Sequence, residues 1–323
     1  MSIIGVVLLV IVIILAAGTI IRATFFRSKK KKIQLYGQMV QVQDGRMHVY
    51  SIGEGEKKIV LLPGLGTPLP SADFAPLMRA LSKSHTAICV EYFGVGFSSE
   101  TSLPRTCKAY VEETRAALTG AGFSPPYLLM PHSLSSIYSE YYAAKYPEEV
   151  EAIISLDGTS SAFYEKIPAF VRGLLPMVKY LQVIGMTSIL PFLITNRKKP
   201  MAYGSTRKEI EDAIIHAGFS INNTFIEQLL QSSEHVKEVM DIPYPSVVPY
   251  LKIIAKTTYE TPVKQLKMSP QEYQRKHLER LGPHAQHEIL DGNHFIHANN
   301  ATTIAEITDR FLAKRNIDIH ENN

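Results

Sequence analysis

A serine stands where an apolar segment gives way to a helical pattern. Tyr127 to Met130 is predicted to form a buried strand, and Ser135 to Lys145 is predicted to form a helix. The connecting residues are Pro131-His132-Ser133-Leu134. A sharp turn here would expose the Ser133 hydroxyl above the sheet, and the following helix would point its N–H groups at a developing oxyanion. Ser133 is therefore the candidate nucleophile.

A histidine near the C-terminus has the position that a general base requires. His294 lies between a predicted last strand, His287 to Leu290, and a predicted last helix at about residues 301 to 314. A neutral imidazole at this point can take a proton from Ser133 and return it to a leaving group. We therefore expect His294 to be the catalytic base.

Several motifs resemble those of the α/β-hydrolase superfamily, over about residues 35 to 315. The chain order of nucleophile and then histidine matches that family. The elbow resembles G-x-S-x-G, with Pro131 and Ser135 in the two glycine positions. Leu61-Leu62-Pro63-Gly64-Leu65-Gly66 resembles the family's strand and H-G-x-G turn. Glu91-Tyr92-Phe93-Gly94-Val95-Gly96-Phe97-Ser98 resembles its D-x-x-G-x-G-x-S loop. Gly292-Asn293-His294-Phe295 resembles its G-H-F segment.

The resemblance implies an oxyanion hole built from backbone. It assigns the N–H groups of Leu65 and Leu134 to this hole. Pro63 replaces the usual histidine of the H-G-x-G turn, which leaves the Leu65 donor in place. Such preorganised donors are typically worth about 3–4 kcal/mol each.

The resemblance leaves two candidates for the catalytic acid. In the usual place, after the strand that ends near Ala255, Thr258 stands where an aspartate is expected and Glu260 is the nearest acid. In the other place, the end of the strand that follows the elbow helix, the residue is Asp157. We favour Asp157 because catalytic groups gather at the carboxyl ends of strands in open α/β sheets. Glu260 stays as the alternative.

Short apolar strands alternate with helices, which predicts a mostly parallel sheet flanked by helices. The fold class expected is therefore α/β, an α/β-hydrolase fold with a helical cap insertion. Strands are predicted at 58–62, 85–92, 127–130, 152–156, 247–255 and 287–290, after a hairpin around 43–45, and helices at 74–83, 107–120, 135–145, 269–281 and 301–314. The expected segments are 1–32 (membrane anchor and basic stretch), 33–158 (core, first part), 159–245 (cap, with an apolar helical stretch over 178–194) and 246–323 (core, last part).

The positive charge of the chain is concentrated at one end. Ile3 to Ile21 is an uncharged apolar run, close to the roughly 20 residues that span a bilayer. Residues 1–32 hold six of the 34 basic residues and none of the 30 acidic residues. Residues 33–323 therefore hold 28 basic and 30 acidic residues, a net charge of −2. This subtraction argues against nucleic-acid binding. The basic residues follow the apolar run, which predicts a single span with the body in the cytoplasm. An apolar leader or a buried helix is the alternative.

The resemblance implies a serine hydrolase that forms an acyl-enzyme with a small-molecule ester or related acyl substrate, lipid-derived substrates included. The alternative is a catalytically inactive α/β-hydrolase-fold binding module tethered to the membrane. The sequence has no P-loop, dinucleotide fingerprint or metal-ligand cluster, so we expect no cofactor and no metal. Cys89 and Cys107 lack C-x-x-C spacing and are not expected to form a disulfide in a cytosolic body.

Overall fold

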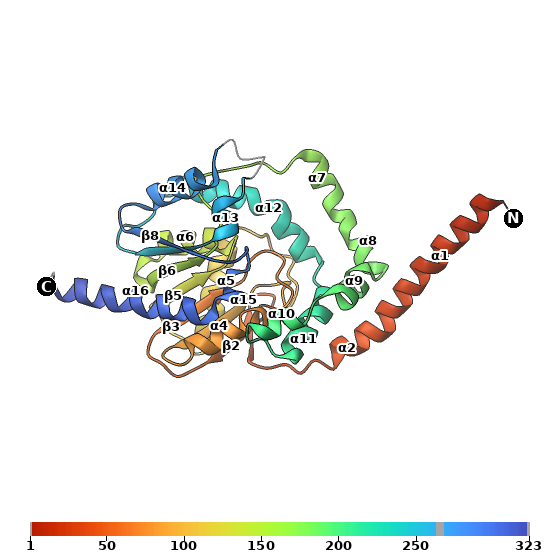
Figure 1. Ribbon diagram of the computed structural model, residues 1–323, viewed down its shortest axis with the longest axis horizontal. Coiled ribbons are helices and arrows are strands. Elements are labelled where there is room, and N and C mark those ends of the chain that lie inside the picture. The colour runs from red at the N-terminus through yellow and green to blue at the C-terminus, as the bar shows by residue number, and fades with distance from the viewer. Residues whose placement is uncertain (1, 263–267, 322–323) are drawn as a thin grey trace.

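Eight strands form one sheet in the computed structural model, which describes residues 2–262 and 268–321 (Figure 1). The order is β1-β2-β4-β3-β5-β6-β7-β8; β2 is antiparallel to β1 and β4, and all other neighbours are parallel. The strands are β1 (Gln38–Val42), β2 (Gly45–Ile52), β3 (Lys58–Leu62), β4 (Thr86–Glu91), β5 (Tyr127–Pro131), β6 (Val150–Leu156), β7 (Tyr250–Ala255) and β8 (Ala285–Leu290). The expected mostly parallel sheet is confirmed, although residues 263–267 and 322–323 of the expected last core segment lie outside the described residues.

Helices follow most of the strands, as the alternating pattern predicts. Helix α5 begins at Cys107 because the Thr106 side chain accepts a hydrogen bond from the Ala109 N–H, which caps the first turn. The helices outside the segment between β6 and β7 are α1 (Ile3–Ile21), α2 (Arg27–Lys31), α3 (Pro70–Asp73), α4 (Ala75–Leu81), α5 (Cys107–Gly120), α6 (Ser135–Lys145), α13 (Lys256–Glu260), α14 (Pro270–Leu281), α15 (Ile296–Asn299) and α16 (Ala301–Glu321). A π-helical turn, Arg22–Phe26, joins α1 to α2.

The sheet is buried on both faces. Alternate residues of β3 point to opposite sides: Ile59 and Leu61 pack into a core with α4 and α16, while Val60 and Leu62 pack into a core with α5 and α6. A strand covered on both faces is mostly apolar, which explains the continuous apolar run from Ile59 to Leu62 in β3. This packing holds the carboxyl ends of the parallel strands at one edge of the sheet.

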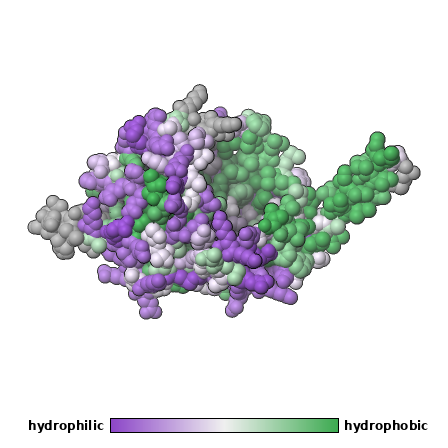
Figure 2. Space-filling model, viewed as in Figure 1, coloured by the Kyte–Doolittle hydropathy of each residue, from purple (hydrophilic) through white to green (hydrophobic). Residues whose placement is uncertain are grey.

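Six helices lie between β6 and β7: α7 (Ala169–Leu174), α8 (Val178–Val183), α9 (Met186–Ile194), α10 (Lys198–Ala202), α11 (Arg207–Ala217) and α12 (Asn223–Met240). The apolar stretch expected to be helical over 178–194 is divided into α8 and α9. Gly185 breaks it because its φ of 82° lies in the left-handed region, which glycine adopts readily. Helices α7 to α9 form an arm with exposed apolar side chains, and Figure 2 shows that this apolar surface adjoins α1.

The N-terminal helix is long and apolar enough to cross a membrane. Among the described residues, Ile3–Lys31 meets this criterion as a single helix, a property that signal sequences share. The segments Ala169–Val183 and Met186–Ile194, bent by 70°, meet it only when taken together. Helix α1 is not isolated from the body, because a Cβ added to Gly18 would lie 2.3 Å from the Ile184 carbonyl oxygen. Backbone therefore touches backbone between α1 and the α8–α9 turn.

A buried acidic residue fixes the loop that follows β4. Glu91 accepts hydrogen bonds from the Ser71 N–H (3.1 Å) and the Phe97 N–H (2.7 Å), and its Oε2 lies 3.1 Å from Nδ1 of His48. Burial acts to lower the pKa of His48, but the Glu91 carboxylate holds that pKa above its usual value. Gly96 must be glycine, since a Cβ there would lie 2.0 Å from Glu91 Oε2. The expected D-x-x-G-x-G-x-S-like loop is thus built around Glu91.

We predict that Glu91→Ala destabilises the protein strongly. The substitution leaves two N–H groups and His48 without their buried acceptor, and breaking a buried pair typically costs about 3–5 kcal/mol. Thermal unfolding of the full-length protein in detergent should show a clearly lower Tm. Glu54→Ala, at an exposed position, is the matched control and should leave the Tm unchanged. Equal Tm values for the two variants would contradict this role of Glu91.

Candidate active site

Ser133 lies in the tight turn between β5 and α6. Its φ of 54° is in the left-handed region, which is strained for a residue with a side chain. The turn is fixed by hydrogen bonds from the Ser133 N–H to the Leu156 oxygen (3.2 Å) and from the Thr159 N–H to the Ser133 oxygen (3.0 Å). A Cβ on Gly64 would lie 3.0 Å from that of Ser133, so the β3 turn approaches the elbow closely.

The two non-glycine residues of the elbow are accommodated by local structure. Pro131 is the last residue of β5, where a missing N–H donor is tolerated. The hydroxyl of Ser135 is buried and donates to the Pro63 carbonyl oxygen, and it lies 3.1 Å from the hydroxyl of Tyr92. Ser135 therefore links the elbow to the β3 turn, a contact that a glycine could not make.

The imidazole of His294 connects Ser133 to Asp157. Its Nε2 lies 2.9 Å from Oγ of Ser133, and its Nδ1 lies 2.7 Å from Oδ2 of Asp157. A carboxylate only accepts hydrogen bonds, so Nδ1 carries the proton and Nε2 can accept the Ser133 hydroxyl proton. The structure thus brings together the three residues that were predicted to act as nucleophile, base and favoured acid.

Asp157 is held rigidly at the carboxyl end of β6. It is buried, its φ is 44°, its Oδ1 accepts from the Ala255 N–H (2.9 Å), and its Oδ2 also accepts from Thr258 Oγ1 (2.7 Å). Thr258, which occupies the usual place of the acid, therefore supports Asp157 instead. The alternative acid, Glu260, is exposed at the end of α13 and makes no contact with His294 among the described residues.

Two backbone N–H groups are available near Ser133. Among the described residues, neither the Leu65 nor the Leu134 N–H donates a hydrogen bond within the protein. Leu134 directly precedes α6, and Leu65 follows Gly64, which lies against the elbow. Neither predicted donor is therefore engaged in a hydrogen bond within the described part of the protein.

A second layer of histidines, His132 and His297, lies next to the site. The sequence places His132 beside the elbow, but it does not predict the hydrogen bond to His294 or the part of His297. The Nε2–H of His132 donates to the carbonyl oxygen of His294 at 2.8 Å. Burial and the neighbouring His297 and His294 lower the pKa of His132 to about 3, so its ring stays neutral. His297 is buried, and its Nε2 lies 2.7 Å from Oδ2 of Asp73. The sequence signal for this layer was the presence of His132 inside the elbow and His297 just after the base.

The site opens to the surface beside the ends of α13 and α14. The side chain of His294 is 46% exposed, and Phe295 next to it is also exposed. A cavity of about 220 Å³ adjoins the site and is lined by Asp157 and His294, with Thr258 and Tyr273 on its wall. Among the described residues, no group of three or more histidine, cysteine or acidic side chains is arranged to hold a metal ion.

Comparison with known proteins identifies the family. A sequence model of the alpha/beta hydrolase fold matches residues 57–186. YbdG, an uncharacterized protein of Bacillus subtilis (strain 168), is 32% identical over 219 residues, which cover 67% of each chain. The chain belongs to the α/β-hydrolase family.

Solved structures of other α/β hydrolases share this fold at low identity. The enol-lactonase from Burkholderia xenovorans LB400 is 19% identical with a TM-score of 0.60 and covers 85% of this chain and 100% of its own. The thioesterase domain from the curacin biosynthetic pathway is 14% identical with a TM-score of 0.57, over 85% and 98% of the two chains. At these identities the likeness is one of fold.

We predict that the two candidate acids of this α/β hydrolase behave differently when neutralised. Asp157→Asn removes the acceptor that holds the Nδ1 proton of His294, so kcat on a short p-nitrophenyl ester should fall by about 10³–10⁴-fold. Glu260→Gln should leave kcat unchanged, because among the described residues the imidazole pairs with Asp157 and Ser133 and not with Glu260. Loss of turnover in Glu260→Gln alone would contradict the assignment of Asp157.

Proposed function

We propose that this chain is a membrane-anchored serine hydrolase that cleaves an ester or related acyl substrate through an acyl-enzyme. The observation that carries the proposal is the continuous hydrogen-bonded chain from Ser133 Oγ through His294 to Asp157. Such a chain activates a hydroxyl that is otherwise a weak nucleophile. A small-molecule substrate accords with membership of the α/β-hydrolase family.

In the acylation step, the Ser133 hydroxyl attacks the acyl carbon while Nε2 of His294 takes its proton. Asp157 keeps the imidazole in the correct tautomer and stabilises the imidazolium that forms. The substrate's carbonyl oxygen, which becomes an oxyanion, is placed to accept from the N–H groups of Leu65 and Leu134. His294 then gives the proton to the leaving group as the tetrahedral intermediate collapses to the acyl-enzyme.

Deacylation repeats the same proton transfers with water as the nucleophile. His294 takes a proton from water, which attacks the Ser133 ester, and it returns that proton to Ser133 Oγ as the acid product leaves. The half-exposed imidazole supports this step, because its side chain is accessible to solvent. No cofactor is needed for either half of the reaction.

A lipid-derived acyl group is the substrate class that the surroundings favour. Phe225 of α12 lies over Gly66, next to the Leu65 donor, and Phe295 is exposed beside the base. The arm formed by helices α7 to α9 adds further exposed apolar side chains. An acyl chain would bury these surfaces, at roughly 25 cal/mol per Å² of apolar area removed from water.

We further propose that α1 anchors the enzyme in the cell membrane as a single span, with the catalytic body in the cytoplasm. The six basic residues that follow the apolar run support this orientation. In this arrangement residues 1–32 form the anchor, 33–158 and 246–323 form the hydrolase core, and 159–245 form the cap. The site is then close to acyl substrates in the inner surface of the membrane.

We predict that a fluorophosphonate probe labels the full-length wild-type protein in detergent and does not label Ser133→Ala. The probe reacts only with an activated serine, and the chain from Ser133 to Asp157 supplies the activation. In-gel fluorescence measures the labelling, and Ser84→Ala, at an exposed serine, is the control that should label normally. Absence of Ser133-dependent labelling in folded protein would refute the proposal that the chain is a serine hydrolase and would favour an inactive binding module.

A further inference from the structure

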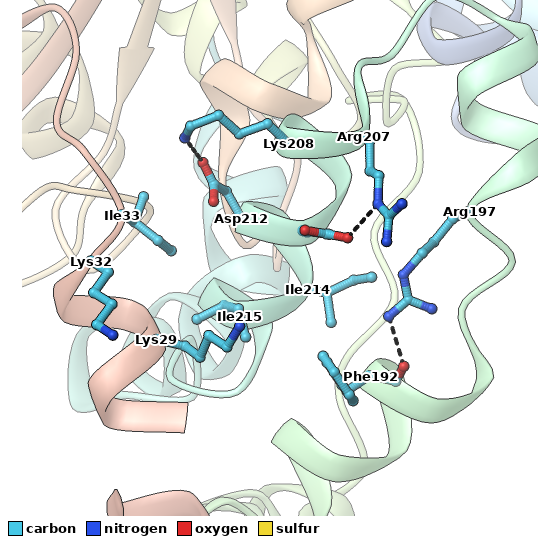
Figure 3. A pocket seen from close by; sticks show the side chains of 11 residues that line it. Lys29, Lys32, Ile33, Phe192, Arg197, Arg207, Lys208, Asp212, Ile214 and Ile215 are labelled. Atoms are coloured by element: carbon cyan, nitrogen blue, oxygen red, sulfur yellow. Dashed lines mark hydrogen bonds and ion pairs between the residues drawn. The ribbon is translucent and has the colours of Figure 1, made fainter. Parts of the chain in front are cut away.

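A pocket of about 640 Å³ lies away from the catalytic residues, where α2 meets the cap (Figure 3). Five of its lining side chains are basic: Lys29, Lys32, Arg197, Arg207 and Lys208. Figure 3 shows the two lysines of the α2 segment on one side of the pocket and the two arginines on the other. Its volume is within the range of roughly 300–1,000 Å³ that is typical of small-ligand sites.

The positive charge of this pocket is only partly neutralised by the protein. Glu211 forms an ion pair with Arg207, and Asp212 forms one with Lys208. Two acids against five basic residues leave a net charge of +3 on the lining. Glu211 also acts at longer range on Arg197 and Lys29, but among the described residues no acid forms an ion pair with Lys29, Lys32 or Arg197.

Arg197 is held in place by neutral groups. Its guanidinium donates to the carbonyl oxygens of Phe192 (2.9 Å) and Thr195 (3.3 Å), and it lies 5.4 Å from the centre of the Phe192 ring. These neutral contacts fix its position without forming an ion pair, although Glu211 acts on its charge at longer range. A guanidinium that is already positioned loses little conformational entropy when it binds an oxyanion such as phosphate.

The rest of the pocket is apolar. Ile33, Phe192, Ile214 and Ile215 complete the lining, and both Ile214 and Ile215 are buried. Basic groups above an apolar floor match an amphiphilic ligand with an anionic head. A freely soluble phosphate compound would leave the apolar floor unused.

The pocket lies at the depth of lipid headgroups if α1 spans the bilayer. Lys29 follows Ile21 by eight residues of continuous helix, or about 12 Å at 1.5 Å per residue. Headgroup layers extend about 5–7 Å beyond the hydrocarbon core on each side, and a long lysine side chain covers the remaining distance.

The cap wall of the pocket is also joined to the membrane helix. Phe26 packs edge-on against Phe192 with ring centres 5.5 Å apart, and Gly18 touches the α8–α9 turn. Leu193 and Ile194, which follow Phe192 directly, are exposed apolar side chains. Figure 2 shows apolar surface of the α7–α9 region next to α1, so a bilayer around α1 would also meet this part of the protein.

We propose that this pocket binds the phosphate-bearing headgroup of an anionic phospholipid from the leaflet next to α2. Lys29, Lys32 and Arg197 bind the phosphate, and the apolar floor receives the first carbons of the lipid. The bound lipid fixes the cap relative to the bilayer. This inference rests on the membrane insertion of α1 in the proposed function, and it does not depend on hydrolysis by Ser133.

The test measures lipid binding to the full-length protein carrying Ser133→Ala, so that the enzyme cannot consume the probe. Fluorescence anisotropy in neutral detergent gives the Kd for dye-labelled phosphatidylglycerol and for dye-labelled phosphatidylcholine. We expect tighter binding of phosphatidylglycerol, by about tenfold. We expect Lys29→Gln with Lys32→Gln, and separately Arg197→Gln, to weaken that binding by about tenfold, each at an unchanged Tm.

The matched control removes two charges from the same basic stretch but outside the pocket. Arg27→Gln with Lys31→Gln changes two exposed residues that do not line it, and the Kd should change less than twofold. An equal loss in both double variants would overturn the proposal in favour of non-specific attraction to the basic stretch. Displacement of the lipid by glycerol 3-phosphate at similar affinity would overturn it in favour of a soluble phosphate ligand. Because fluorophosphonate labelling tests Ser133 separately, the two proposals can fail independently.

Discussion

The arrangement of the site depends on parallel strands that end at one edge of the sheet. Strands β5, β6, β7 and β8 are adjacent and parallel, and Ser133, Asp157 and His294 follow the ends of three of them. The 2.7 Å contact between His294 and Asp157 forms only when the register of these strands is correct. Apolar cores on both faces fix that register, so packing far from the site sets its geometry.

The site concentrates strain at the residues that hold the chemistry. Ser133 and Asp157 are two of three residues other than glycine with a positive φ in the described chain. Asp157 directly follows β6, and Ser133 lies two residues after the end of β5, and both strands are in the centre of the sheet. Such conformations cost about 1–3 kcal/mol each and persist where the surroundings determine them. Here the surroundings are backbone hydrogen bonds between the elbow and β6, and between Asp157 and the end of β7.

Much of this framework could be predicted from the sequence, because its signals are local. The bounds of α5 and α6 follow from apolar periodicity, and the position of Ser133 follows from the strand and helix around it. No local sequence signal decides whether Asp157 or Glu260 is the catalytic acid. The choice depends on how β6 and β7 pair, and the hydrogen bond from Thr258 to Asp157 explains why a threonine stands where an acid was sought.

Contacts between distant segments were the part that the sequence could not predict. Gly185 was overlooked inside an apolar stretch that reads as one helix, yet its turn meets Gly18 of α1. The basic residues that follow the apolar run indicated only a charged stretch next to a membrane span, yet two of them, Lys29 and Lys32, line a pocket with residues of the segment between β6 and β7. In both cases the partner lies far away in the chain, so periodicity and composition carry no signal for the contact.

The central claim is that Ser133 forms an acyl-enzyme with help from His294 and Asp157. Rapid-quench mass spectrometry during turnover of a p-nitrophenyl ester tests it most directly. The account predicts an acyl group on the peptide that contains Ser133, formed in a burst that equals the enzyme concentration. Steady turnover with no acylated peptide at any time, or with the acyl group on another residue, would contradict it.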